Sequence, residues 1–356
     1  MAVQLEHDPA LVQAPEPVLE VIDLVTEIRS ARGTVRPVNR VNLRVFPGQA
    51  VGLVGESGSG KSMTAFSIMR LFPTRAARVV EGQVRLQGRD LARLPEEELR
   101  RVRGRQIGMV FQDPSAYLNP VLTVGAQIAE QLRAHGWPGD VEERVAYLLR
   151  QVGLRPEVAR RYPHELSGGM RQRVCIASAI ACDPPLVLAD EPTTALDVTV
   201  QAQILQLLAH LQRERRMGLL LITHDFGIVA ELCDYVYIMY AAEIVEEGPV
   251  EEVFERPRHP YTQGLLDGML SVTRRDRVRV TIPGSVPDLV QPPSGCRFHP
   301  RCARAMPQCR TAPPPRVQVG ACRTACWLYQ SEQGLDGAAT GVGGNHDRTS
   351  DGIQAG

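Results

Sequence analysis

The chain has 356 residues, of which 44% are hydrophobic, so it is long enough for about two domains with a sizeable core. Its 40 lysine and arginine residues balance 40 aspartate and glutamate residues, which excludes the net positive field typical of nucleic-acid binders. Glu6 and Asp8 stand where a secretory signal peptide carries positive charge, and apolar runs such as Gly218–Ile222 are too short to cross a bilayer. We therefore expect a cytoplasmic protein with no nucleic-acid partner, whose role at a membrane would be that of a peripheral subunit.

The N-terminal part of the chain predicts a tail followed by strands. Residues 1–16 are polar and interrupted by prolines, and we expect them to form a flexible tail. Val18–Val25 and Val41–Phe46 have the composition of strands, and the turn-rich stretch Arg29–Asn39 is expected to join them. A Pro-Gly pair at positions 47 and 48 then predicts a tight turn into a third strand.

That third strand, Val51–Val54, ends in a glycine-rich loop just ahead of the helix-compatible stretch Met63–Arg70. The loop reads Gly55-x-x-x-x-Gly60-Lys61-Ser62, the spacing of a phosphate-binding loop, in which backbone N–H groups and a helix N-terminus bind phosphate oxygens. We expect Lys61 to reach the β and γ phosphates and the Ser62 hydroxyl to bind Mg²⁺. The nucleotide contacts predicted for this segment are Gly55, Ser57, Gly58, Gly60, Lys61, Ser62 and Met63.

The next part of the chain moves from strands to helices. Strands are predicted at Gly82–Leu86 and Gln106–Phe111, on either side of a charged helical stretch, Pro95–Arg103. Beyond them Thr123 can cap one helix and Asp140 a second. These helices predict a helical insertion into a strand-rich chain.

Strand patterns return in the second half. They occur at Leu186–Ala189, Leu219–Thr223 and Tyr235–Met239, with a helix at Val200–Arg213 between the first two. Strands that alternate with helices and are interrupted by one helical block predict an α/β fold, with a mostly parallel sheet and a grafted helical subdomain.

Two further motifs carry the chemistry of a phosphate site. Asp190 and Glu191 end an apolar strand, where Asp190 would hold Mg²⁺ through water and Glu191 would orient or deprotonate an attacking water. Ser167 is a good N-cap, and the glycines that follow it, Gly168 and Gly169, leave the N–H groups of a helix start open to an anion. The chain thus has a second predicted phosphate-binding element.

Together these motifs resemble an ABC-transporter ATPase subunit over about residues 18–250. Leu166–Gln172 matches the family signature, Gly55–Ser62 the Walker A loop, and Leu186–Glu191 the Walker B strand. The shorter family motifs are matched by Gln112 (Q-loop), Ala195-Leu196-Asp197 (D-loop) and His224 (switch histidine).

The resemblance implies a P-loop NTPase fold with a RecA-like core, an antiparallel β subdomain, a helical subdomain and a small C-terminal extension. The implied divisions are a tail at 1–16, the core at 17–112 and 183–250, the signature subdomain at 113–182, the extension at 251–330 and a disordered tail at 331–356.

The resemblance also implies roles and a shared site. In the family, the signature of one subunit faces the Walker A loop of another, with ATP between them. The implied catalytic residues are Glu191, His224, Lys61 and Gln112; the Mg²⁺ ligands are Ser62, Gln112 and Asp190; and Ser167, Gly168, Gly169 and Asp197 complete the nucleotide contacts. One departure is Ile28, which stands where the family usually stacks an aromatic residue on adenine, so an apolar contact would replace the stacking.

The C-terminal part resembles the extension of oligopeptide and dipeptide importer ATPases. The similarity lies in Arg258–Leu266, Ile282–Pro287 and Gly295–Cys302. Met170 in the signature resembles the D-type subunit of that pair. The resemblance then implies a related F-type ATPase partner, two membrane permeases, an external substrate-binding protein, and a peripheral location on the cytoplasmic face of the inner membrane.

Five cysteines crowd this extension, and in a cytosolic protein such a cluster favours a metal over disulfides. The resemblance implies a [4Fe–4S] cluster on Cys296, Cys302, Cys309 and Cys326. Zinc on four cysteines and a loop without metal are the alternatives. Cys322 could replace Cys326 as the fourth ligand or remain a free thiol.

The function expected is ATP hydrolysis that drives import of dipeptides or oligopeptides. Nickel complexes and glutathione remain alternative cargoes, because selectivity in such systems lies in other subunits. The alternatives from other classes are a soluble ABC ATPase acting on ribosomes or DNA, and a metal-dependent interaction module. Since a second chain must complete the site, we expect the isolated protein to bind ATP but hydrolyse it poorly.

Overall fold

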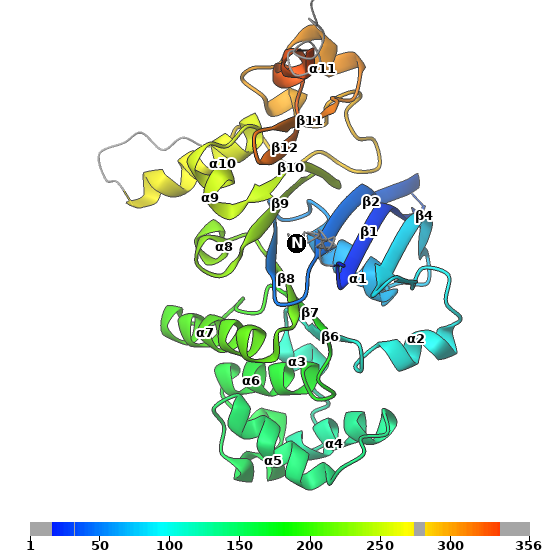
Figure 1. The fold of residues 1–356 in the computed structure, drawn as a ribbon, viewed down its shortest axis with the longest axis vertical. Helices are drawn as coiled ribbons and strands as arrows, with labels where there is room; N and C mark the ends of the chain where they lie inside the picture. The colour runs from blue at the N-terminus through cyan, green and yellow to red at the C-terminus, as the bar shows by residue number, and fades with distance from the viewer. Residues whose placement is uncertain (1–15, 32, 274–281, 335–356) are drawn as a thin grey trace, which may run out of the picture.

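The computed structural model describes residues 16–31, 33–273 and 282–334, which form two sheets flanked by helices. Figure 1 shows the larger sheet in the middle of the molecule, with the smaller sheet beside it. The larger sheet, in spatial order, consists of β11 (Arg316–Val319), β12 (Cys322–Ala325), β10 (Glu243–Pro249), β9 (Tyr235–Tyr240), β3 (Ala50–Val54), β8 (Gly218–Thr223), β7 (Leu186–Asp190) and β6 (Ile107–Val110).

The strands from β9 to β6 are parallel, as the alternation of strands and helices predicted. Every residue of β3, β6, β7 and β8 is buried, which explains why these strands are continuous apolar runs rather than alternating ones. Parallel strands place their carboxyl ends at one edge of the sheet, where ligands bind in such folds. The segments that follow β3, β7 and β8 therefore meet at that edge.

The smaller sheet is antiparallel, in the order β2, β1, β4, β5. Its strands are β1 (Leu19–Ser30), β2 (Gly33–Val45), β4 (Ala77–Leu86) and β5 (Arg89–Asp90). The prediction of a long turn at Arg29–Asn39 was wrong, because β1 runs to Ser30 and pairs with Gly33 at the start of β2. Shifts in register between Val21 and Ile28 interrupt the alternation of apolar residues, so the sequence pattern ends before the strand does.

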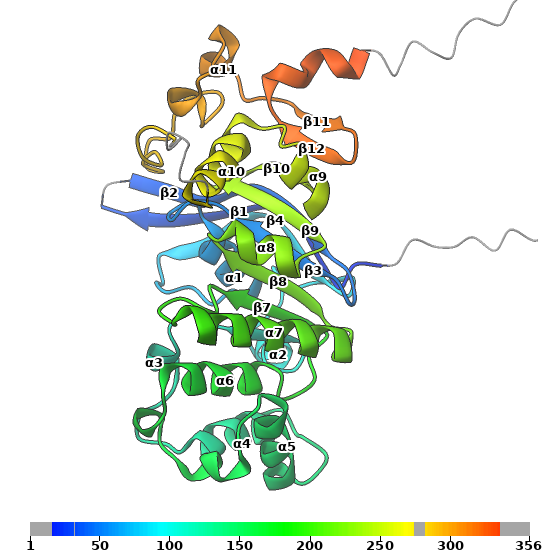
Figure 2. The ribbon, with the colours of Figure 1, turned by 90° about the vertical axis from the view of Figure 1, so that its left-hand side faces the viewer.

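The helical insertion forms a separate lobe, drawn in green at the bottom of Figure 2. Thr123 and Asp140 cap its helices as predicted, accepting hydrogen bonds from Ala126 N and from the N–H groups of Glu142 and Glu143. Its α-helices are α3 (Pro114–Tyr117), α4 (Val124–Ala134), α5 (Val141–Gln151) and α6 (Gly168–Ala179), and 3-10 turns lie at Pro156–Arg160 and Pro163–Glu165. The helices of the sheet region are α1 (Lys61–Met69), α2 (Glu96–Val102), α7 (Val198–Arg215) and α8 (Phe226–Leu232).

The C-terminal part continues the larger sheet. Two helices, α9 (Val250–Glu255) and α10 (Pro260–Thr273), are followed by residues 282–334, which we call the cysteine lobe. Its strand β12 pairs with β10, so the lobe adds an antiparallel edge to a sheet that begins in the N-terminal half. The rest of the lobe contains α11 (Pro307–Thr311) and 3-10 turns at His299–Arg301 and Trp327–Gly334.

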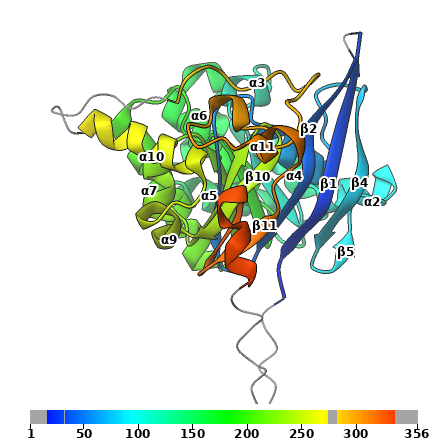
Figure 3. The same ribbon diagram turned by 90° about the horizontal axis from the view of Figure 1, so that it is seen from above.

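Both predicted tails fall mostly outside the described residues. Of the stretch predicted as a disordered tail, residues 331–334 lie in the last 3-10 turn, and 335–356 are not described. Within the described ranges no helix has the length and hydropathy needed to cross a membrane. Figure 3, viewed from above, shows the cysteine lobe lying over the larger sheet.

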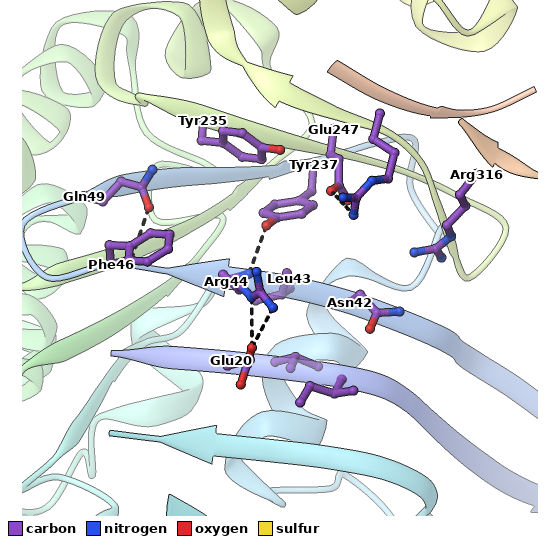
Figure 4. Close-up of a pocket in the computed structure, with 13 residues that line it drawn as sticks. Glu20, Asn42, Leu43, Arg44, Phe46, Gln49, Tyr235, Tyr237, Glu247 and Arg316 are labelled. Atoms are coloured by element: carbon purple, nitrogen blue, oxygen red, sulfur yellow. Dashed lines mark hydrogen bonds and ion pairs between the residues drawn. The ribbon is translucent and has the colours of Figure 1, made fainter. Parts of the chain in front are cut away.

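A hollow of about 690 Å³ separates the smaller sheet from β9 and β10, at the amino ends of β3 and β9 (Figure 4). Its charged side chains are largely paired with each other, Arg44 with Glu20 at 2.9 Å and Arg323 with Glu247 at 3.2 Å. Tyr237 Oη accepts a hydrogen bond of 2.9 Å from the backbone N–H of Arg44, which joins the two sheets. This hollow therefore lies at the interface between the two sheets. It is at the amino ends of the parallel strands, whereas the phosphate loop is at their carboxyl ends.

Candidate functional site

The loop after β3 has the tight geometry that its glycines predict. A Cβ atom on Gly55 would lie 2.1 Å from the carbonyl oxygen of Met239, and one on Gly60 would lie 2.1 Å from that of Pro37. Gly58 has open space around it but a φ of +79°, which glycine adopts most readily. The loop therefore packs too closely against neighbouring backbone for larger residues at either end.

Lys61 begins α1 with its ammonium folded onto the loop. Its Nζ donates to the carbonyl oxygens of Gly55 (2.8 Å) and Glu56 (2.9 Å). Burial lowers the pKa of Lys61, and the nearby charges of Glu191 and Asp190 oppose that shift. The half-buried Met63 follows in α1, packed against the core.

Ser62 and Asp190 come together as the Mg²⁺ prediction requires. The Ser62 hydroxyl donates to Asp190 Oδ1 at 2.9 Å, where β7 ends beside the start of α1. Burial raises the pKa of Asp190 to about 6, against the lowering effect of Ser62 and Lys61. A buried carboxylate beside a hydroxyl is the hard-oxygen donor set that suits Mg²⁺, so these residues fit that ion.

Two of the other predicted catalytic residues, Gln112 and His224, converge on Glu191. Its carboxylate accepts a 3.0 Å hydrogen bond from Gln112 Nε2, and His224 Nδ1 lies 3.2 Å from its Oε1. Sequence reasoning missed Thr194, whose hydroxyl donates to the same carboxylate at 2.9 Å. Glu191 also has a φ of 43°, an uncommon conformation for a non-glycine residue and one that is found at functional sites.

Gln112 contacts Glu191 rather than the two other predicted Mg²⁺ ligands. No hydrogen bond joins it to Ser62 or Asp190 within the described residues. Its role as a metal ligand stays a prediction.

The signature residues lie apart from this convergence. Ser167 caps α6 by accepting from Met170 N at 3.3 Å, and Asp197 caps α7 by accepting from Val200 N at 3.0 Å. A Cβ on Gly169 would meet the Val200 side chain at 2.6 Å, so the two helix starts adjoin. Within the described part of the chain, no hydrogen bond links Ser167, Gly168 or Gly169 to the phosphate loop. Their contact with phosphate stays a prediction.

Ile28 lies near the end of β1, half-buried and paired with Val35 and Ala77. Its contact with adenine stays a prediction.

The four predicted cluster ligands line one small hollow. Cys296, Cys302, Cys309 and Cys326 surround it, together with the rings of His259, Phe298 and Trp327. Each sulfur accepts a backbone N–H, from Phe298, Arg304, Met306 and Leu328 respectively. Cys322 is elsewhere, buried against Gly248 of β10, so the structure brings Cys326 and not Cys322 to the hollow.

Burial raises the pKa of the Cys296 thiol to about 12 and that of Cys326 to about 11. Within the described residues, no three His, Cys, Asp or Glu side chains converge closely enough to hold a single metal ion. The structure therefore brings the four predicted ligands to one hollow without distinguishing iron–sulfur from zinc, and the metal stays a prediction.

Comparison with family models gives two matches along the chain. Residues 38–194 match the model described as ABC transporter, and residues 245–309 match that of the oligopeptide/dipeptide transporter C-terminal region.

Curated relatives match most of the length. A putative peptide import ATP-binding protein of Brucella ovis is 51% identical over 320 residues, covering 85% of this chain and 94% of the relative. A protein of the same description from Brucella suis biovar 1 is 48% identical over 315 residues, covering 87% and 94%.

Solved structures resemble about two thirds of the chain. A dimeric ATP-binding cassette, MJ0796, bound to ADP and Pi, has a TM-score of 0.59 at 29% identity and covers 65% of this chain and 98% of its own. The cbiO1 protein of Clostridium perfringens, part of the ABC transporter complex cbiONQ, has a TM-score of 0.57 at 25% identity, covering 68% and 92%.

Proposed function

The chain belongs to the ABC-transporter family as an ATP-hydrolysing subunit, and we propose that it powers the uptake of dipeptides or oligopeptides through partner permeases. The observation that carries the ATPase part is the convergence of Gln112 and His224 on the Glu191 carboxylate, next to the phosphate loop. The match of residues 245–309 to a peptide-transporter extension supports the choice of cargo.

The contacts of the site support the proposed roles. The N–H groups of the phosphate loop and the Lys61 ammonium bind the phosphates, and the Glu191 carboxylate accepts a proton from the attacking water. Gln112 and Thr194 donate to Glu191 and so orient it, while His224 lies against its other oxygen and would contact the γ phosphate. Ser62, Asp190 and Gln112 would hold Mg²⁺, which neutralises phosphate charge when bound.

A second subunit completes the site in this proposal. Ser167, Gly168 and Gly169, with Asp197, would face the phosphate loop of that partner, because their own loop does not contact them. The dimeric state of the neighbour MJ0796 supports the arrangement. Loss of the γ phosphate removes an anion that both surfaces bind, which favours the open dimer.

The partners proposed are those of a peptide importer. Met170 in the signature favours a D-type subunit paired with an F-type ATPase, together with two permeases and an external binding protein, on the cytoplasmic face of the inner membrane. The working division of the chain is the core at 17–112 and 183–250, the signature subdomain at 113–182 and the extension at 251–330.

We also propose that Cys296, Cys302, Cys309 and Cys326 hold a [4Fe–4S] cluster with a structural role. The support is that all four thiols line one hollow and accept backbone N–H groups. Such a cluster would fasten the proline-rich lobe to the sheet.

Purification of the full chain with its co-expressed permeases tests the transport assignment. The expected result is a stable complex whose ATP turnover rises when a peptide-loaded binding protein is added. Nickel complexes and glutathione serve as alternative cargoes, and stimulation by one of them alone would replace peptide as the substrate. Recovery of the chain without permeases, with turnover indifferent to all three cargoes, would favour a soluble ATPase.

A further inference from the structure

Arg301 is a buried arginine of the cysteine lobe that reaches the phosphate loop. Its guanidinium makes a two-pronged ion pair with Glu56, the second residue of the loop, at 2.7 and 3.0 Å (Nη1 to Oε2 and Nη2 to Oε1). Its Nε donates to the carbonyl oxygen of Pro283 at 2.7 Å, and its guanidinium carbon lies 5.7 Å from the ring centre of Tyr240. The Arg301 side chain is only 6% exposed, so this fork is held in place by the lobe around it.

Three contacts hold Glu56 in place. Its backbone N–H donates to Tyr261 Oη at 3.0 Å, its carbonyl oxygen accepts from Lys61 Nζ at 2.9 Å, and its carboxylate binds Arg301. Tyr261 is itself fully buried beside Tyr240 and Phe298, with ring centres 4.6 and 5.4 Å away. Two of the three contacts come from the C-terminal part of the chain.

The negative charge of the Glu56 carboxylate also affects phosphate binding. A negative charge on the second residue of a phosphate-binding loop repels a polyphosphate, and the repulsion is strong where water is partly excluded. Arg301 neutralises this charge and turns it toward the lobe. The ion pair between Arg301 and Glu56 is buried against Tyr240, so solvent and salt screen it less than they would screen a surface ion pair.

We propose that Arg301 is a positioning residue of the nucleotide site: with Tyr261 it holds Glu56 in place and cancels its charge, so that ATP binding depends on the cysteine lobe. The proposal uses the ATP binding that the family supplies and does not depend on which cargo is transported. Because Cys302 directly follows Arg301, the cysteine hollow and the phosphate loop are joined through two adjacent residues.

The test is the affinity of the purified full chain for a fluorescent ATP analogue with Mg²⁺. Loss of a charged hydrogen bond corresponds to roughly a tenfold or greater change, so Arg301→Gln is expected to weaken binding by about tenfold or more. Tyr261→Phe, which removes one neutral bond, is expected to weaken it by about threefold. In the assembled transporter Arg301→Gln should raise KM for ATP with little change in kcat.

Arg297→Gln is the matched control. Arg297 lies in the same lobe, is 12% exposed and pairs with Glu243 at 3.1 Å, but it does not contact the loop in the described residues. The double variant Glu56→Gln/Arg301→Gln is the second test. Arg301→Gln alone leaves the Glu56 carboxylate unpaired, and the double variant removes that charge, so it should recover much of the affinity for the ATP analogue.

Wild-type affinity in Arg301→Gln, or a loss no larger than in Arg297→Gln, would overturn the proposal. So would a double variant as weak as Arg301→Gln, since that result indicates a folding role alone. If Arg301→Gln does not fold, Tyr261→Phe decides, because unchanged affinity there contradicts the hold on Glu56.

Discussion

The phosphate loop and the cysteine lobe are built in opposite ways. The loop is a continuous stretch, Gly55–Ser62, whose function follows from local spacing between one strand and one helix. The cysteine hollow brings together side chains from three segments, at His259, between Cys296 and Cys309, and at Cys326. The contact of the lobe with the loop joins Arg301 to Glu56 across 245 positions of the chain. The nucleotide site therefore has a local part, the phosphate loop, and a distant part, the contact that Arg301 makes from the extension.

The largest expected effect is that of a substitution at Glu191, next to the phosphate loop. Glu191→Gln should retain ATP binding but lower hydrolysis in the assembled complex by roughly 10²-fold or more, because the proton acceptor is lost. Steady-state ATP turnover and analogue binding, measured on the same preparation, check this. Unchanged turnover would remove Glu191 from the catalytic role.

Gly60→Ala tests whether the loop depends on close backbone packing. The added Cβ would lie 2.1 Å from the Pro37 carbonyl oxygen, so we expect the affinity for an ATP analogue to fall by roughly tenfold or more. Gly58→Ala is the control in the same loop, since Gly58 also has a positive φ (+79°) but nothing within 4 Å. Equal losses in both variants would attribute the effect to φ rather than to packing.

The pH dependence of stability tests the packing around the cysteine hollow. Burial lowers the pKa of His259, which lines the cysteine hollow, to about 3 from an ordinary value of 6.5. The unfolded chain therefore binds a proton below pH 6.5 that the folded chain does not, and stability falls as the pH drops through the window from 6.5 toward 3. Between pH 7 and pH 5 this amounts to about 2 kcal/mol.

His259→Asn keeps an acceptor for the Tyr261 N–H, which donates to His259 Nδ1 at 3.1 Å, but does not titrate. Denaturant unfolding at pH 7 and pH 5 should show the wild type losing about 2 kcal/mol more than the variant. The nearby Glu246 is common to both proteins, and burial raises its pKa, which gives a slope of the opposite sign. Equal losses in the two proteins would contradict the assignment to His259.

The smallest expected effect on ATP affinity is that of Cys302→Ser, which distinguishes the cysteines of the hollow from Cys322. Cys302→Ser should abolish any brown absorbance of anaerobically purified protein and weaken ATP binding by about threefold through the neighbouring Arg301. Cys322→Ser, whose thiol packs against Gly248 instead, should leave the absorbance unchanged. Colourless wild-type protein with one equivalent of zinc would contradict the cluster.

Local patterns predicted the parts of the molecule that local forces determine. The helix caps at Thr123 and Asp140 depend on side chains two or three residues from their partners, and the buried parallel strands are continuous apolar runs. The long β1–β2 hairpin was missed because register shifts break its alternation. Thr194, which contacts Glu191, lies outside the recognised motifs. Arg301 lies within the recognised stretch Gly295–Cys302, but that stretch does not indicate a contact with Glu56, which is 245 positions away.

ATP-dependent uptake of a labelled dipeptide into membrane vesicles that contain the assembled transporter tests the central claim most directly. The account predicts uptake with ATP and the wild-type chain, and loss of uptake with Glu191→Gln at equal complex content. Uptake that persists with Glu191→Gln, or ATP hydrolysis that proceeds with no peptide uptake for any dipeptide or oligopeptide supplied with its binding protein, would contradict it.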